Sequence, residues 1–105
     1  MKIYNLKNMI KGWIIGNFVP SLYNCDYEVG VKKYVKGDKE GAHFHKLAIE
    51  FTVIISGIVK MNGTIYKADD IIEISRNEIT DFECIEDAVT VVIKTVSNPS
   101  DKYMV

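Results

Sequence analysis

The chain has 105 residues, of which 48% are hydrophobic and 26% are charged, and its formal net charge is −1. This length and composition predict one globular domain, and the near-neutral charge gives no general attraction for nucleic acid or for an anionic membrane surface. The longest uncharged apolar run, 51–59, is too short to span a bilayer, and polar residues interrupt any signal-peptide core at the N-terminus. We therefore predict a cytoplasmic protein with neither a nucleic-acid nor a membrane partner.

The first half of the chain has the pattern of β-strands joined by short loops. Residues 1–20 give no clear periodicity and fit an N-terminal arm or an edge strand. Residues 27–35 alternate apolar and polar side chains, as a half-buried strand does. A polar loop at 37–41 follows, and then 49–55 is a continuous apolar and β-branched run, which is typical of a core strand. Ser56-Gly57 is expected to end that strand in a turn.

The second half continues the same pattern. Asn62-Gly63 separates two apolar runs, and this dipeptide is the strongest short-range hairpin signal because a type I′ turn needs positive φ at both central residues. A further turn is expected at 86–88. The remaining strands are expected at 71–74, 82–85 and 89–96. Strands at short spacing with turns between them predict an all-β sandwich or barrel.

Two histidines and one carboxylate lie within eight residues of each other and are the strongest chemical signal in the chain. His43 and His45 are two residues apart, so both imidazoles point to the same side of an extended strand. Glu50 lies on the next apolar run, and its carboxylate can meet the imidazoles if the chain turns back between them. Two histidines and one carboxylate with open positions form a facial metal-binding set. The spacing therefore predicts a metal-dependent small-molecule site.

The pattern Gly37-x5-His43-x-His45-x4-Glu50-x6-Gly57 resembles the first motif of the cupin superfamily at every anchor. The resemblance implies an all-β, cupin-type jelly-roll β-barrel. It also implies that the two histidines and the glutamate bind a divalent metal ion inside the barrel. Iron, manganese, nickel and zinc all occur in such sites, and the sequence does not distinguish among them.

The second cupin motif is incomplete in this chain. Ser75 and Asn77 stand where that motif has proline and glycine, and Thr80 stands where it has the histidine that is the usual fourth ligand. Three alternatives follow. The metal is held by three ligands only; or Glu78 or Asp81 supplies another oxygen ligand; or no metal is bound and the polar trio binds an organic ligand or does acid–base work.

Charged residues are unevenly distributed along the sequence. Residues 69–90 are strongly acidic. The segment 32–46 is rich in lysine, with Lys32, Lys33, Lys36, Lys39 and Lys46. Both segments fit solvated strand edges and loops. Alternatively, lysines near the mouth of the barrel attract an anionic substrate such as a phosphorylated sugar or a carboxylate, or the two segments complement each other in a dimer.

We predict one barrel with appended ends that forms a homodimer: an arm or edge strand at 1–20, the barrel at 21–97 and a C-terminal tail at 98–105. The arm is the predicted dimer contact. The resemblance to small cupins, which commonly pair through an edge strand or an arm, supports this prediction.

The leading functional hypothesis is binding of a small polar or anionic metabolite, with a divalent metal at His43, His45 and Glu50. Thr80, Glu78 and Asp81 are further candidates for the pocket. Whether the protein is an enzyme is left open. Two alternatives stand beside this hypothesis: a non-catalytic, metabolite-sensing module without metal, and a metal-independent sugar isomerase or epimerase.

Overall fold

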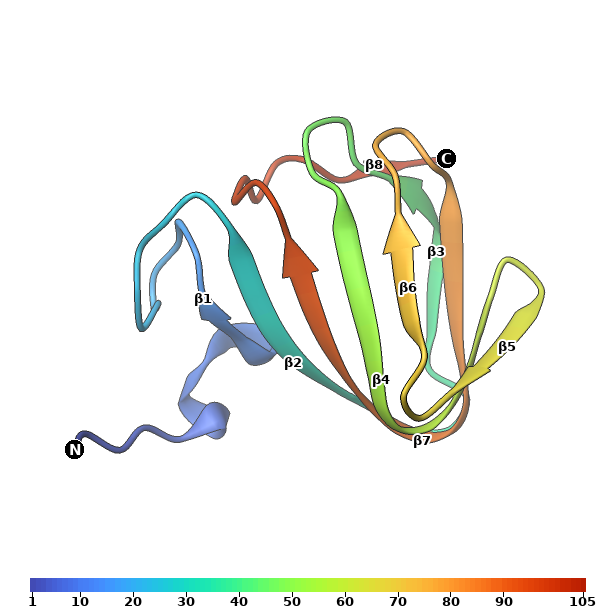
Figure 1. Cartoon of the computed structure of the whole chain (residues 1–105), viewed down its shortest axis with the longest axis horizontal. Helices are drawn as coiled ribbons and strands as arrows, with labels where there is room; N and C mark the ends of the chain where they lie inside the picture. The colour runs from blue at the N-terminus through green and yellow to red at the C-terminus, as the bar shows by residue number, and fades with distance from the viewer.

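Eight antiparallel β-strands form one sheet that curls into a barrel (Figure 1). The structure is a computed structural model that describes all residues, 1–105. Two short 3-10 turns, η1 (Leu6–Asn8) and η2 (Ile10–Gly12), precede the strands. The strands are β1 (Trp13–Ile15), β2 (Glu28–Tyr34), β3 (Lys39–Phe44), β4 (Glu50–Met61), β5 (Thr64–Lys67), β6 (Ile71–Ile74), β7 (Thr80–Lys94) and β8 (Tyr103–Met104). The predicted all-β fold is confirmed.

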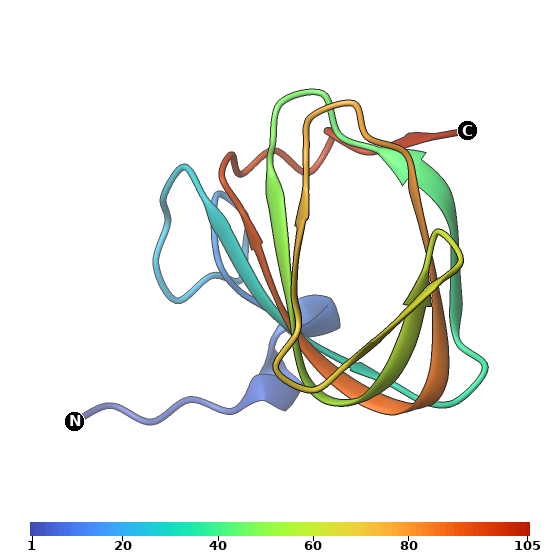
Figure 2. The same ribbon diagram turned by 45° about the vertical axis from the view of Figure 1, so that its right-hand side comes forward.

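The barrel has two walls that face each other (Figure 2). In the first wall, β1 pairs with β2, β2 with the last part of β7, that part of β7 with the first part of β4, and β4 with β6. In the second wall, β3, β5 and β8 join the first part of β7 and the last part of β4. The two long strands thus belong to both walls, and they hold the barrel together.

The long strands pass from one wall to the other by bending, with register shifts between Ile54 and Val59. The predicted turns at Ser56-Gly57 and 86–88 are therefore wrong, since both positions lie inside continuous strands. Gly57 allows the bend: its φ is +84°, and a Cβ there would collide with the backbone of the β7 segment around Asp87. Local turn signals cannot distinguish a bend within a strand from a break between two strands, because both need glycine.

The interior of the barrel is apolar at the bent end and polar at the other end. Seven buried side chains form the apolar cluster: Ile54, Val59, Met61, Ile74, Phe82, Cys84 and Ala88. Tyr34 packs on this cluster, with its ring centroid 4.4 Å from that of Phe82. Ile54, Val59, Cys84 and Ala88 of this cluster lie at or beside the bend, so the polar end is left as the place for a site.

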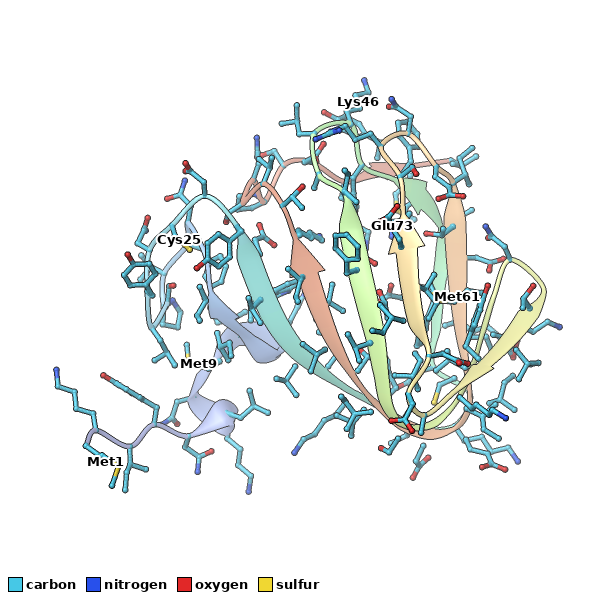
Figure 3. The ribbon with its side chains drawn as sticks, in the orientation of Figure 1. Met1, Met9, Cys25, Lys46, Met61 and Glu73 are labelled. Carbon is cyan, nitrogen blue, oxygen red and sulfur yellow. The ribbon has the colours of Figure 1, made fainter.

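The two ends of the chain behave differently. Figure 3 shows Met1 at the far end of an arm that runs away from the barrel, whereas Lys46 lies on the loop after β3 at the polar end. The C-terminal tail returns to the barrel, where Tyr103 and Met104 pair with Phe44 and His43 of β3. The division into arm, barrel and tail stays a prediction. No helix in the chain has the length and hydropathy of a membrane span.

Candidate functional site

A cavity of about 520 Å³ lies inside the barrel. His43, His45, Glu50 and Thr80 all line it. They come together because β3 ends, β4 begins and β7 begins at this same end of the barrel. The structure thus brings the three predicted metal ligands and the threonine of the incomplete second motif to one cavity.

Both histidines are buried, and each is held by a backbone carbonyl group. Nδ1 of His43 lies 2.8 Å from the carbonyl oxygen of Gly41, and Nδ1 of His45 lies 3.0 Å from that of Asp101. A carbonyl oxygen only accepts hydrogen bonds, so Nδ1 is the donor in both rings. In a neutral imidazole, the other nitrogen, Nε2, then carries a free lone pair.

His45 is held in this neutral form by its surroundings. Burial lowers its pKa to about 4, and the Lys94 ammonium group adds to this effect, while the Asp101 carboxylate opposes it. Nε2 of His45 is buried and has no hydrogen-bond partner. An unpaired polar atom in a buried position is costly, and it is typical of a site that is completed by a ligand.

The Nε2 lone pair of His45 and a carboxylate oxygen of Glu50 lie close together. Nε2 of His45 is 3.7 Å from Oε1 of Glu50, and the second carboxylate oxygen accepts a hydrogen bond of 3.0 Å from the Thr52 hydroxyl. With His45 neutral and protonated on Nδ1, no proton lies between the nitrogen and the oxygen. A cation or a hydrogen-bond donor placed between them would satisfy both atoms.

The donor chemistry fits a divalent metal ion, although the three ligands are not all gathered. Two atoms that bind one zinc ion at about 2.1 Å each lie about 3 to 3.5 Å apart, close to the separation of His45 and Glu50. The ring centroid of His43 lies 5.4 Å from that of His45. As the side chains stand, no group of three or more His, Cys, Asp or Glu residues is gathered for a metal ion.

The other predicted pocket residues have different positions. Thr80 is buried and is paired with His43 across β3 and β7. Asp81 is at the rim: it is exposed and accepts a hydrogen bond of 2.7 Å from the Asn62 backbone. Glu78 does not line the cavity. It lies in the turn before β7, where its carboxylate accepts a 2.9 Å hydrogen bond from Ser75 N, so the extended backbone that would put it beside Thr80 is not formed.

Sequence reasoning missed Asp101, which supports the site from the C-terminal tail. Its carboxylate accepts hydrogen bonds from the backbone N–H groups of Lys46, Leu47 and Ala48, and its carbonyl oxygen orients His45. Burial alone would raise the pKa of Asp101, but these three N–H donors hold it below its usual value. No local signal marks this residue, since its partners lie more than 50 positions earlier in the chain.

Sequence reasoning also missed a row of charges on the inner face of the first wall. Lys94 of β7 is the register partner of both Glu28 of β2 and Glu50 of β4. Of the five lysines in the segment 32–46, only Lys32 lines the cavity, where it is joined by lysines from elsewhere in the sequence: Lys11, Lys94 and Lys102. The strand alternation in 27–35 is the signal that could have placed Glu28 and Lys32 on one face.

Comparison with solved structures identifies the fold. A protein from Klebsiella pneumoniae with a double-stranded β-helix domain matches with a TM-score of 0.66 at 21% identity, over 75% of this chain and 70% of that one. An RmlC-like cupin from Shewanella frigidimarina matches with a TM-score of 0.66 at 15% identity, over 74% of this chain and 72% of that one. Oxalate oxidase in complex with glycolate matches with a TM-score of 0.63 at 17% identity, over 76% of this chain and 46% of that one.

The chain therefore has the cupin fold, the double-stranded β-helix, and the predicted cupin-type jelly-roll barrel is confirmed. At identities this low, the likeness shows the fold alone. No protein-family model matches the chain, and no curated protein matches it.

Proposed function

We propose that this cupin-fold protein binds a small polar or anionic metabolite in its barrel, with a divalent metal ion held by His43, His45 and Glu50. The observation that carries the proposal is the buried Nε2 atom of His45, which has no partner and lies 3.7 Å from the Glu50 carboxylate. A metal ion at this position would use the free lone pair and the negative charge together.

The hydrogen bonds at Nδ1 of the two histidines support this proposal. Metal-bound histidines almost always donate their other ring N–H group to a carbonyl or carboxylate, which fixes the ring and its tautomer. Both His43 and His45 have such a carbonyl partner. When bound, a divalent metal would supply Lewis-acid chemistry, while the chain's own residues orient the imidazoles and exclude water. Oxalate oxidase, which shares the fold, holds the substrate analogue glycolate.

The test is metal analysis of the protein purified without chelator and then loaded with iron, manganese, nickel or zinc. We expect one metal ion per chain, and we expect the His43→Ala, His45→Ala double variant to lose it because both imidazole ligands are gone. The Glu73→Gln variant is the matched control and should keep the metal, because this carboxylate is exposed and does not line the cavity. No bound metal under any loading condition would contradict the proposal.

A gain-of-ligand variant tests the role assigned to position 80. Thr80 is buried beside His43 and lines the cavity, so Thr80→His should add a fourth ligand and tighten metal binding by about tenfold or more. Titration with a competing chelator measures the change. An affinity equal to that of the wild type would mean that position 80 does not take the place of the second-motif histidine.

A second candidate function is a binding module that works without metal. Two observations favour it: Thr80 stands in place of a ligand, and no three donor groups are gathered. In this case the metabolite itself would supply the hydrogen-bond donor between His45 and Glu50. Metabolite binding that is unchanged in the presence of a strong chelator would support this candidate.

A metal-independent sugar isomerase or epimerase is the enzymatic form of this second candidate. Here His45 would act as a base on the bound sugar, with Glu50 beside it. Turnover of a carbohydrate phosphate in chelator that is lost in Glu50→Gln would support it. Binding without turnover would favour the non-catalytic module.

The homodimer also remains a proposal, and the outer face of the first wall gives it a second contact besides the arm. Register pairing places Val31, Val91, Val53 and Ile71 in one apolar row across four strands, and Ile71 is 66% exposed. An apolar row of this kind is suited to packing on a second copy of itself. Light scattering should report a dimer that Val53→Glu converts to monomer; loss of the dimer only on removal of 1–9 would assign the contact to the arm.

A further inference from the structure

We propose that the cavity contains an anion-binding subsite, formed by Lys32 and Lys94 beside the ring of Trp13 and completed by Thr90, which takes a carboxylate or phosphate group of the ligand. The inference rests on the proposed function in one respect only, that the cavity holds a small molecule. It does not depend on the metal ion. It narrows the ligand from a polar or anionic metabolite to an anionic one.

The centre of the subsite is the indole ring of Trp13. Nζ of Lys32 is 5.0 Å from the ring centroid, and Nζ of Lys94 is 5.1 Å from it. The ring can lie against the first wall because β2 has glycine there: a Cβ at Gly30 would be 2.7 Å from Cε3 of Trp13. The close approach of the indole therefore explains why β2 has glycine at position 30, in the interior of a strand. Two ammonium groups are held near one aromatic ring inside the cavity.

Neither ammonium group has a carboxylate partner. The ion pairs within 4.0 Å in this chain are Lys39–Glu83 and His45–Glu50. Lys94 lies between two glutamates in register, and yet its ammonium group turns to the indole. Nζ of Lys32 donates a 2.7 Å hydrogen bond to a backbone carbonyl, that of Lys11, which leaves further N–H groups free.

The acidic groups of the cavity are engaged elsewhere. Glu28 accepts a hydrogen bond from the Ser97 hydroxyl at 3.2 Å, Glu40 accepts one from the Tyr34 hydroxyl at 3.3 Å, and Glu50 accepts one from Thr52 at 3.0 Å. Each of these three carboxylates thus has a hydroxyl partner, and none forms an ion pair with Lys32 or Lys94, although Glu28 and Glu50 flank Lys94 in register.

The positive groups also disfavour each other. Burial lowers the pKa of Lys32, Glu40 opposes this, and the nearby ammonium groups of Lys11, Lys94 and Lys102 lower it further. All four lysines line the cavity. An anion bound among them would remove this repulsion, which favours anionic ligands over neutral ones of the same size.

Thr90 supplies independent support. Its side chain is 1% exposed and lines the cavity, and its hydroxyl oxygen is buried without a hydrogen-bond partner. Thr90 of β7 is also the register partner of Lys32 of β2, so both side chains leave the same part of the first wall. A hydroxyl group can donate to an anionic oxygen, and such a charge-assisted bond would satisfy this buried atom.

The chain carries its own reporter for the test, because Trp13 is its only tryptophan. Binding is measured by tryptophan fluorescence at low ionic strength with three matched three-carbon probes: glycerate, glycerol 3-phosphate and glycerol. We expect a saturable change with an anionic probe and none with glycerol. Lys32→Met and Lys94→Met should each raise the Kd of that anion by about tenfold or more, since each removes one charged donor. Lys39→Met, which removes a lysine outside the cavity, is the control and should leave the Kd unchanged.

Three results would overturn the inference: no saturable change with either anion, glycerol binding as tightly as the anions, or unchanged Kd values in both lysine variants. The tighter of the two anions decides between carboxylate and phosphate. Metal content measured on the same samples separates this inference from the proposed metal site. Metal binding without a preference for anions would support the proposed metal site and contradict the anion-binding subsite. Anion binding without metal would support the subsite and contradict the metal site.

Discussion

The two ends of the barrel interior are built from the same strands and yet have opposite chemistry. At the bent end, β4 and β7 contribute Ile54, Val59 and Cys84, all with 1% exposure or less. At the open end, the same two strands contribute Glu50, Thr80 and Lys94, and Nε2 of His45 is buried there without a partner. Strand alternation decides which side chains point inward, but the position along the strand decides whether they stabilise the barrel or serve the cavity.

This difference shows how a small barrel can contain a polar cavity. Unpaired buried polar groups cost free energy, and the net free energy of unfolding of a chain of this size is small. The packed end offsets that cost because its apolar side chains are removed from water. We therefore expect substitutions at the bent end to lower stability, and substitutions at the open end to change binding with little loss of stability.

The largest effect should come from Ile54→Ala, since this side chain is fully buried in the apolar cluster. We expect a loss of about 4 kcal/mol in the free energy of unfolding, from lost burial and from the cavity left behind. Urea denaturation measures this loss. The smaller change Ile54→Val should lower the free energy of unfolding by only about 1 kcal/mol. A loss below about 1 kcal/mol for Ile54→Ala would mean that the bent end does not carry the stability.

Asp101→Asn should have the next largest effect, because Asp101 is an exception at the open end: a polar group that stabilises. Its carboxylate holds three backbone N–H groups of the loop after β3, so we expect a loss of about 3 kcal/mol near neutral pH.

The pH dependence of Asp101→Asn gives a second measurement. The folded state lowers the pKa of Asp101, so the contribution of its carboxylate is present above about pH 4 and is lost as the pH falls through the lowered value. The difference between wild type and variant should therefore shrink below pH 4. A difference that stays constant down to pH 2 would show that the charge is not responsible.

A smaller effect is expected at the bend that joins the two ends. Gly57→Ala would put a Cβ against the backbone around Asp87 at a φ of +84°, and we expect a loss of about 2 kcal/mol. Gly37→Ala is the matched control: its φ is +94°, but a Cβ there meets nothing within 4 Å, so only about 1 kcal/mol should be lost. Equal losses in thermal or urea unfolding would mean that the close approach at the bend is relieved at no cost.

The smallest effect on stability should come from Thr90→Val. Its buried hydroxyl has no partner, so an apolar side chain of the same shape should leave the free energy of unfolding unchanged or raise it by up to about 1 kcal/mol. The same variant should weaken binding of the anionic probe. A clear loss of stability would mean that Thr90 belongs to the packed end rather than to the cavity.

The sequence predicted the parts of this molecule that depend on spacing along one strand. The i, i+2 spacing of His43 and His45 placed both imidazoles on the inner face, and the apolar run after Glu50 marked the core strand. Both statements need only local geometry. The all-β barrel followed from the same kind of pattern.

The parts that depend on pairing between distant strands could not be predicted. Lys94 reaches the cavity only because β7 pairs with both β2 and β4. Asp101 orients His45 although the two residues are 56 positions apart in the sequence. The charge pattern of 32–46 does not indicate that Lys32 alone among its lysines lines the cavity. Glu78 was misplaced because strand pairing of β7 begins after it, not before it.

The long separation between His45 and Asp101 also bears on the order in which the molecule is made. During translation, His45 is added 56 residues before Asp101, whose carbonyl group orients the His45 ring. Both walls need β7, which ends at Lys94, so the walls can form only shortly before Asp101 is added, and until then the ring of His45 is free to turn. Closing so long a loop is among the slower steps available to a folding barrel. Competence for the ligand should thus be acquired late, after the barrel itself has formed.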